Sequence, residues 1–465
     1  MKLRQWQKKC IDRALVHYSN SNAHFMCLAT PGAGKTTMAS VLSKKLFESE
    51  LIDLVICFSP SAIVSQDFRI ELQHQCQKRF DGSLGSSGCS LTYQGMLCLD
   101  DEFWKLLHEF RVFIIFDEIH HCAGGEISQA NAWGEKIANQ IQGKAAYTLA
   151  LTGTPWRSNR TPIVLSNYCD NNRVQCNYSY GLAQAINDGV CRVPHITMVD
   201  NEQITLKQGR DETEFSSFGE MLNKEKISYQ DLVENDELLA YLLKQADQRL
   251  NHIRNAFPNA GGLIVASSVT HARKIHRLLS SNLNEQADIA TYLEKDAATV
   301  IQRYKNTTRK WIISVGMISE GTNIPRLQVC CHLTRVKTEL YFRQILGRIL
   351  RASGNTREIG YLYIPAEPSL MEYAYRISED VPSDIVVVPH SLPEVGHCNS
   401  NKSFVVFRDN HHSSHDLELI EGGRSILSQS FMGGSTLSAD YENSFGEFGR
   451  FKKEIFSLLE HNCLG

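Results

Sequence analysis

A glycine-rich string between an apolar run and a helical pattern constrains this chain more than any other feature. Residues 23–30 form a short apolar run, residues 29–36 read ATPGAGKT, and residues 36–48 carry apolar residues at helical spacing. A strand, a glycine loop and a helix in this order form a cradle for phosphate groups, because the loop amides and the helix N-terminus favour anions. The string therefore predicts a parallel α/β sheet that presents this loop.

The residues of this phosphate loop have separate predicted roles. Lys35 is expected to reach the β- and γ-phosphates of ATP, and the Thr36 hydroxyl is expected to bind Mg²⁺. The usual string begins with glycine, and Ala29 stands in that place. The residues predicted to contact the nucleotide here are Pro31, Gly32, Ala33, Gly34, Lys35, Thr36 and Thr37.

Two adjacent acids, Asp117 and Glu118, follow the apolar run VFIIF of residues 112–116. Such a run predicts a central strand buried on both faces, and ligands of open α/β sheets bind at the carboxyl ends of the strands. We predict that Asp117 holds Mg²⁺ through water and that Glu118 orients and deprotonates the attacking water. Of the two histidines that follow, one is predicted to couple this site to a second domain. Either His120 or His121 could instead be a plain surface histidine.

Three polar residues far along the chain are spaced four and three apart: Gln344, Arg348 and Arg351. On a helix predicted over residues 339–352 they share one face. Polar side chains on an otherwise apolar helix need a partner, and a γ-phosphate is one; an arginine there contributes roughly 10³ to 10⁵ in rate. The alternative is a surface face that makes salt bridges.

The alternation of strand-like and helix-like segments occurs twice, which predicts two α/β domains with parallel sheets. We place the first over residues 1–195 and the second over 196–380, with a small C-terminal extension of unknown role over 381–465. Further strands are expected at 54–58, 145–151, 263–266, 311–315 and 329–333, and further helices at 62–78, 270–281 and 297–305. In the extension, residues 448–461 carry an apolar stripe that predicts a helix.

Composition excludes several classes of protein. The net charge of −3 argues against a generally basic nucleic-acid binder, although a groove can still be read through local charge. The 14 cysteines show no CxxC spacing, which is typical of the reduced thiols of a cytosolic protein. No apolar stretch approaches the ~20 residues that span a bilayer, and the charged N-terminus lacks an apolar signal core. We therefore expect a cytoplasmic protein without a membrane partner.

The C-terminal extension contains several potential metal ligands, but their spacing fits no standard zinc pattern. A solvated loop is the preferred interpretation. No nuclease signature follows the acidic residues of the extension, so the chain is not expected to cut nucleic acid by itself. The residues concerned are His390, His397, Cys398, His411, His412 and His415.

The ordered strings resemble the motifs of superfamily 2 helicases, which are built from two RecA-like domains. ATPGAGKT resembles motif I, DEIH motif II, LTGTP (151–155) motif III, SEGTNIP (319–325) motif V and QILGRILR (344–351) motif VI. The start LRQWQ (3–7) and the TGTP and QxxGRxxR strings are most similar to type III restriction-enzyme helicase subunits and related DNA-repair translocases. The resemblance covers roughly residues 1–365.

The resemblance also implies roles for residues outside these strings. Gln7 is similar to the glutamine that bonds adenine. Asn323 stands where the family usually has an acid that helps bind ribose or couple the domains, which predicts altered nucleotide affinity or coupling. By position, contacts to nucleic-acid phosphates are expected at Ser59, Thr92, Ser268 and Thr322, where a structural hydroxyl is the alternative at each.

The function implied is an ATP-dependent helicase or translocase that acts on nucleic acid, DNA in the first place. ATP and Mg²⁺ are the cofactors, and a nuclease or other complex partner is expected. Two alternatives stay open. One is an ATP-driven remodelling switch in a DNA repair or defence complex without unwinding, and the other is a DExH-type RNA helicase.

Overall fold

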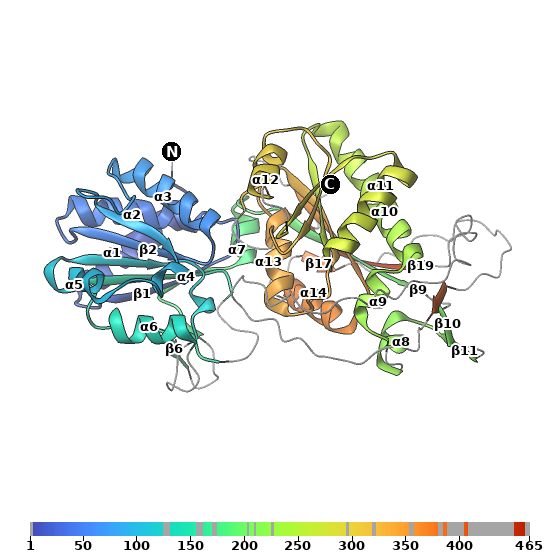
Figure 1. Cartoon of the computed structure of the whole chain (residues 1–465), viewed down its shortest axis with the longest axis horizontal. Helices are drawn as coiled ribbons and strands as arrows, with labels where there is room; N and C mark the ends of the chain where they lie inside the picture. Colours follow the sequence, from blue (N-terminus) through green and yellow to red (C-terminus); the bar gives the residue numbers. More distant parts are fainter. Residues whose placement is uncertain are drawn as a thin grey trace. The chain divides into compact units, whose positions relative to one another are not determined.

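The computed structural model describes residues 3–123, 131–154, 161–169, 174–201, 204–208, 211–224, 227–293, 297–318, 322–352, 358–379, 385–387, 404–407 and 451–460. The chain divides into two compact units. The first comprises Met1–Cys191, Glu320–Asn323 and Ile420–Gly423, and the second comprises Arg192–Ser319, Ile324–Leu419 and Arg424–Gly465. Each unit is built around its own largely parallel sheet (Figure 1).

The sheet of the first unit has six parallel strands in the order β3-β2-β4-β5-β1-β8. Its strands are β1 (His24–Ala29), β2 (Leu54–Ser59), β3 (Gly88–Thr92), β4 (Val112–Phe116), β5 (Tyr147–Thr152) and β8 (Tyr178–Tyr180), with a small hairpin of β6 (Asn167–Tyr168) and β7 (Val174–Gln175). Its helices are α1 (Gln5–Ser19), α2 (Lys35–Glu48), α3 (Ala62–Cys76), α4 (Tyr93–Met96), α5 (Asp101–Glu109), α6 (Ala132–Gln140), α7 (Leu182–Asn187) and the 3₁₀ helix η1 (Ile119–His121).

The core of this unit follows from strands that are apolar on both faces. All five residues of β4 are buried, as the VFIIF run predicts. On one face Ile114 and Phe116 belong to a cluster that includes Trp104 of α5 and Ile137 of α6. Figure 1 shows α2 and α3 on one side of the sheet and α6 on the other. Helices on both faces explain why the strand has no polar side.

The sheet of the second unit has eight strands in the order β13-β14-β12-β15-β16-β9-β19-β17. The run from β13 to β9 is parallel, and β19 and β17 are antiparallel to their neighbours. Its strands are β9 (Val193–Asn201), β12 (Gly261–Ala266), β13 (Ala287–Thr291), β14 (Trp311–Val315), β15 (Leu327–Leu333), β16 (Ile359–Pro365), β17 (Ile385–Val387) and β19 (Phe451–Glu460).

Helices flank this second sheet as well. Figure 1 shows α10 and α11 on one side of it and α13 and α14 on the other. The helices of the unit are α8 (Phe218–Lys224), α9 (Tyr229–Val233), α10 (Asp236–Ala256), α11 (Val269–Leu283), α12 (Ala297–Lys305), α13 (Glu339–Ile349) and α14 (Pro368–Glu379). A separate three-stranded sheet contains β11 (Asp211–Phe215), β10 (Ile204–Gln208) and β18 (Phe404–Phe407). Within the described residues, every helix is too short or too polar to cross a membrane.

The predicted fold class, α/β with two tandem parallel sheets, is confirmed. The helix predicted over residues 448–461 is wrong, because Phe451–Glu460 is the strand β19. It pairs with β9 from Phe451 opposite Asn201 to Ser457 opposite His195. Without β19, the backbone groups along that edge of β9 would be unpaired, and strand pairing satisfies them where an isolated helix would not. This part of the extension therefore belongs to the second sheet.

Candidate functional site

The phosphate loop joins the end of β1 to the start of α2. Gly32 and Gly34 have φ angles of 85° and 95°, a left-handed region that glycine adopts without steric cost. Lys35 is the first residue of α2. Thr36 and Thr37 follow in the first turn and are half-buried. The loop thus ends at a helix N-terminus, where backbone amides and the helix dipole attract anions.

Side chains at the start of α1 hold the loop in this conformation. The Arg4 guanidinium donates to the Ala33 carbonyl at 2.7 Å, and the Trp6 indole donates to the same oxygen at 3.2 Å. The Gln7 amide donates to the Gly34 carbonyl at 2.9 Å. Of these three residues, only Gln7 was predicted to have a role. The signal for Arg4 and Trp6 was their place in the same LRQWQ string.

Gly34→Ala is expected to lower the melting temperature and to weaken ATP binding by about fivefold, because a displaced loop misplaces the phosphates. An alanine Cβ there would lie 2.9 Å from Gln7 Nε2, at a backbone φ of 95°. Gly143→Ala is the matched control, since Gly143 also has a positive φ of 76° but has open space around it. Thermal melting and ATP titration of both variants test this. Equal ATP affinity in the two variants would contradict the packing argument.

Three predicted strings meet at the carboxyl end of the first sheet. Lys35 Nζ lies 2.9 Å from Glu118 Oε1 and donates to the Ala29 carbonyl at 3.2 Å. The Gly153 amide of LTGTP donates to Glu118 Oε2 at 3.0 Å. A Cβ on Gly153 would lie 3.1 Å from the Pro31 ring, so only glycine allows this close approach without adjustment. One carboxylate therefore joins the phosphate loop to LTGTP.

The pKa values of the two adjacent acids are shifted in opposite directions. Burial, together with the charge of Glu118, raises the pKa of Asp117 to about 7. Burial also disfavours the charged form of Glu118, but the Lys35 ammonium, His120 and the Gly153 amide outweigh it and hold the pKa of Glu118 at about 2. Glu118 thus keeps its charge at neutral pH. Asp117 is buried beside it, and a cation bound nearby would stabilise the charged form of this carboxylate.

Both histidines of DEIHH are buried, so the alternative of a plain surface histidine is wrong. His120 Nδ1 lies 3.4 Å from Glu118 Oε2 and 3.0 Å from Thr152 Oγ1. Thr154 Oγ1 is also within 3.4 Å of the same nitrogen. His120 therefore links the acid pair to LTGTP within the first unit.

In the second unit, α13 carries Gln344 and Arg348 one turn apart on the same face, both largely buried. Arg351 lies beyond the helix, which ends at Ile349, so the predicted helix over 339–352 is too long. Arg192 donates to two carbonyls at the C-terminal end of α13. The Arg192 amide donates to the Leu350 carbonyl at 2.7 Å, and the Arg192 guanidinium donates to the Ile349 carbonyl at 3.1 Å.

The predicted nucleic-acid contacts fall into two groups. Thr92 and Ser268 cap α4 and α11, accepting the amides of Gly95 at 2.9 Å and His271 at 3.0 Å. Such a hydroxyl can still donate its proton to a phosphate. Ser59 and Thr322 are buried, and their side chains could reach a phosphate only if their neighbours moved.

Several predicted features lie outside this region. The Asn323 side chain is exposed. Pro155, residues 319–321 and the histidines of the extension lie outside the described residues. Among the residues that are described, no cluster of three or more His, Cys, Asp or Glu could hold a metal ion.

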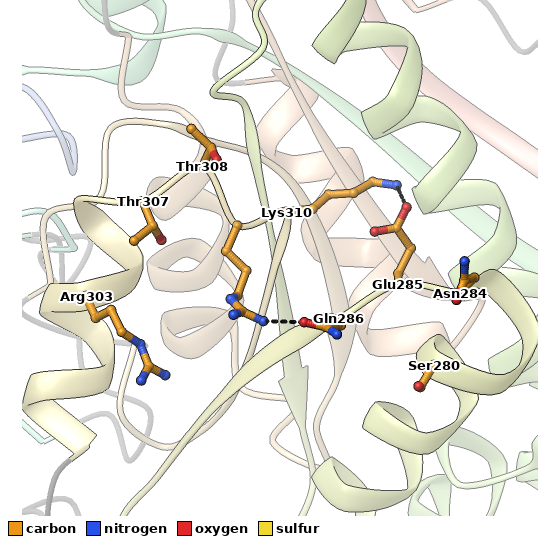
Figure 2. A pocket seen from close by; sticks show the side chains of 9 residues that line it. Ser280, Asn284, Glu285, Gln286, Arg303, Thr307, Thr308 and Lys310 are labelled. Atoms are coloured by element: carbon orange, nitrogen blue, oxygen red, sulfur yellow. Dashed lines mark hydrogen bonds and ion pairs between the residues drawn. The ribbon is translucent and has the colours of Figure 1, made fainter.

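A cavity of about 660 Å³ lies in the second unit, between the C-terminal end of α11 and the loop after α12 (Figure 2). Its basic side chains are paired: Lys310 contacts Glu285 at 2.6 Å, and both Arg303 and Arg309 contact Asp288. None of the residues predicted to bind nucleotide or nucleic acid lines it.

Known proteins share this architecture. Residues 1–157 match the family model described as type III restriction enzyme, res subunit. A fragment assigned as the HsdR subunit of a type I restriction enzyme from Vibrio vulnificus has a TM-score of 0.57 at 16% identity, covering 82% of this chain and 67% of that one. The type ISP restriction-modification enzyme LlaBIII, solved bound to DNA, has a TM-score of 0.53 at 16% identity, covering 82% and 30%.

The two parallel-sheet units are therefore RecA-like domains, as in these enzymes. Together with the family model matched over residues 1–157, this fold supports a relationship to the helicase-like superfamily 2. An uncharacterised protein of Mycobacterium tuberculosis is 31% identical over 392 residues, covering 80% of this chain. The chain spans 62% of the length of that relative.

Proposed function

We propose that the chain is a translocase or helicase that hydrolyses ATP and uses the energy to move along nucleic acid. DNA is the nucleic acid that we propose. The observation that carries this proposal is the grouping of Lys35, Glu118 and Gly153 beside the phosphate loop. An ionised carboxylate next to the phosphate-binding lysine can orient and deprotonate a water molecule. In this proposal Glu118 is the base and Lys35 binds the β- and γ-phosphates.

The donors near the loop fit a Mg²⁺ ion. Thr36 offers a hydroxyl in the first turn of α2, and Asp117 offers a buried carboxylate at the end of β4. Oxygen donors of this kind, few in number and completed by water and phosphate oxygens, suit Mg²⁺. When bound, the ion would neutralise charge on the phosphates. The loop residues 31–37 and Gln7 would hold the nucleotide around it, and Asn323 would bond the ribose or help couple the domains.

The second domain supplies the residues proposed to act on the γ-phosphate. Gln344, Arg348 and Arg351 would stabilise charge that develops on the γ-phosphate. Their string, QILGRILR, resembles motif VI of the superfamily 2 helicases, and this resemblance supports the role. The hydroxyls of Thr92 and Ser268 would contact phosphates of one nucleic-acid strand. Those of Ser59 and Thr322 would do so only after their neighbours moved.

DNA is proposed over RNA for two reasons. The matched family model is that of a restriction enzyme subunit, and the neighbour LlaBIII is a restriction-modification enzyme bound to DNA. A nuclease or other complex partner would follow from the same family.

The deciding experiment measures the rate of ATP hydrolysis with single-stranded DNA, duplex DNA and RNA, with strand displacement in parallel. Stimulation by DNA with displacement supports a helicase. Stimulation without displacement supports a translocase or a remodelling switch, and stimulation by RNA alone favours an RNA helicase. Hydrolysis that none of the three changes would overturn the proposal.

Stimulation by DNA is expected to weaken as salt rises, because neutralised phosphates release counterions on binding. If about two or three phosphates of a single strand are neutralised, half-maximal stimulation should need about tenfold more DNA at ~200 mM than at ~50 mM salt. Two unrelated sequences of equal length serve as the control and should behave alike, since backbone contacts carry no sequence information. A strong preference for one sequence would reveal a base-reading element.

A further inference from the structure

A single buried arginine stands at the start of the second unit. Arg192 is 1% exposed and directly precedes β9. A guanidinium has five N–H donors and stays charged, so burying it is costly unless acceptors surround it. The neighbours of Arg192 therefore show what this charge is used for.

The acceptors come from four separate segments of the second unit. Nη1 donates to the carbonyl of Leu327, the first residue of β15, at 2.6 Å and to that of Ile349, the last residue of α13, at 3.1 Å. Nη2 donates to the carbonyl of Pro325, the end of GTNIP, at 3.0 Å. Nε pairs with Glu358 Oε2 at 2.6 Å, just before β16. One side chain thus ties together the segments that follow motif V and end motif VI.

The counter-charge of this cluster is also held in place. Glu358 is buried, accepts from Gln328 Nε2 at 3.1 Å and bonds the Val193 amide through its carbonyl at 3.0 Å. The planar guanidinium can meet acceptors that lie in different directions at once, whereas the ammonium of a lysine could not span the same set. The cluster of Arg192 and Glu358 is therefore specific to arginine.

We propose that Arg192 is a positioning residue for the ATP hydrolysis proposed above, on which this inference rests. It holds Pro325, at the end of GTNIP, and the helix of Gln344 and Arg348 in a fixed relation to each other within the second unit. Breaking the cluster leaves the nucleotide cradle of the first unit intact but misplaces Arg348. A misplaced group of this kind lowers turnover more than it lowers substrate binding.

Arg192→Lys and Glu358→Gln test the proposal in the full chain. Both keep a polar group in the buried site, whereas Arg192→Ala would leave Glu358 buried without its partner. We expect kcat for DNA-stimulated hydrolysis to fall by about tenfold or more, with KM for ATP within about threefold of the wild-type value. Hydrogen exchange of peptides covering residues 322–333 and 339–350 should become faster in both variants.

Asp247→Asn is the matched control, because it weakens another buried ion pair of the same unit, Asp247 with Lys310 at 2.6 Å. Lys310 keeps Glu285 as a partner in this variant (Figure 2). Asp247→Asn should lower the melting temperature while leaving kcat within about twofold of the wild-type value. Wild-type kcat with unchanged exchange in Arg192→Lys, or an equal loss of kcat in Asp247→Asn, would overturn the positioning role. If the wild-type chain shows no DNA-stimulated hydrolysis, the proposed function fails, and the exchange experiment alone still decides whether Arg192 orders these segments.

Discussion

Glu118→Gln is expected to bind ATP with near wild-type affinity and to hydrolyse it at least about 100-fold more slowly, because only the proton-accepting carboxylate is lost. A glutamine side chain can still accept the Gly153 amide through its carbonyl oxygen. Lys35→Ala is expected to abolish hydrolysis and to weaken ATP binding as well, because the ammonium that would bind the phosphates is removed. The two variants therefore separate the base from the cradle.

Equilibrium binding of a fluorescent ATP analogue and phosphate release measure the two effects independently. Lys105→Ala is a suitable control, since Lys105 forms an exposed ion pair with Glu102 on α5, away from the loop. It should change neither quantity. Hydrolysis at the wild-type rate in Glu118→Gln would show that another group activates the water, and the assignment of Glu118 would be withdrawn.

Arg348→Ala is expected to lower the rate of ATP hydrolysis by roughly 10³, the lower end of the range for arginines that stabilise a transferred phosphoryl group. Binding of ATP should change little, because the loop proposed to hold the phosphates lies in the first unit. Arg351→Ala is expected to act in the same direction. Because α13 ends at Ile349, the helix does not fix the position of the Arg351 side chain.

Arg343→Ala is the matched control for this experiment. Arg343 lies on the same helix, five residues before Arg348, and pairs with Glu339 at 2.9 Å. Single-turnover hydrolysis with saturating ATP compares the two variants without a contribution from product release. Equal rates in Arg348→Ala and Arg343→Ala would mean that Arg348 has no special part in the reaction.

Local patterns predicted much of the fold correctly. The runs at 112–116, 297–305 and 311–315 coincide with β4, α12 and β14. Strands buried on both faces and helices with an apolar stripe show a strong period in sequence. No helix was predicted within the polar residues 201–258, yet α10 lies there and five of its leucines are buried. The many polar residues of this helix made the spacing of its apolar residues hard to recognise in the sequence.

The strand β19 was missed for a different reason. The spacing of apolar residues over 448–461 is compatible with a helix, and the deciding partner is β9, some 250 residues earlier in the chain. Whether a segment joins a sheet depends on an open edge that its own sequence does not contain. The same limit explains the overlong prediction for α13, whose last carbonyls are bonded by Arg192.

Local strings in the sequence were enough to predict the glycine loop between β1 and α2 and the acid pair that follows β4. Each of them depends on a strand and the few residues that follow it, where neighbours in sequence are neighbours in space. Only the tertiary structure revealed that Glu118 joins Lys35 to Gly153, and that Arg4 and Trp6 hold the loop. Only the tertiary structure brought Arg192 to the ends of two motifs, through bonds to residues 133 to 166 positions away. Such contacts depend on how the strands are ordered in the sheet, which no local periodicity records.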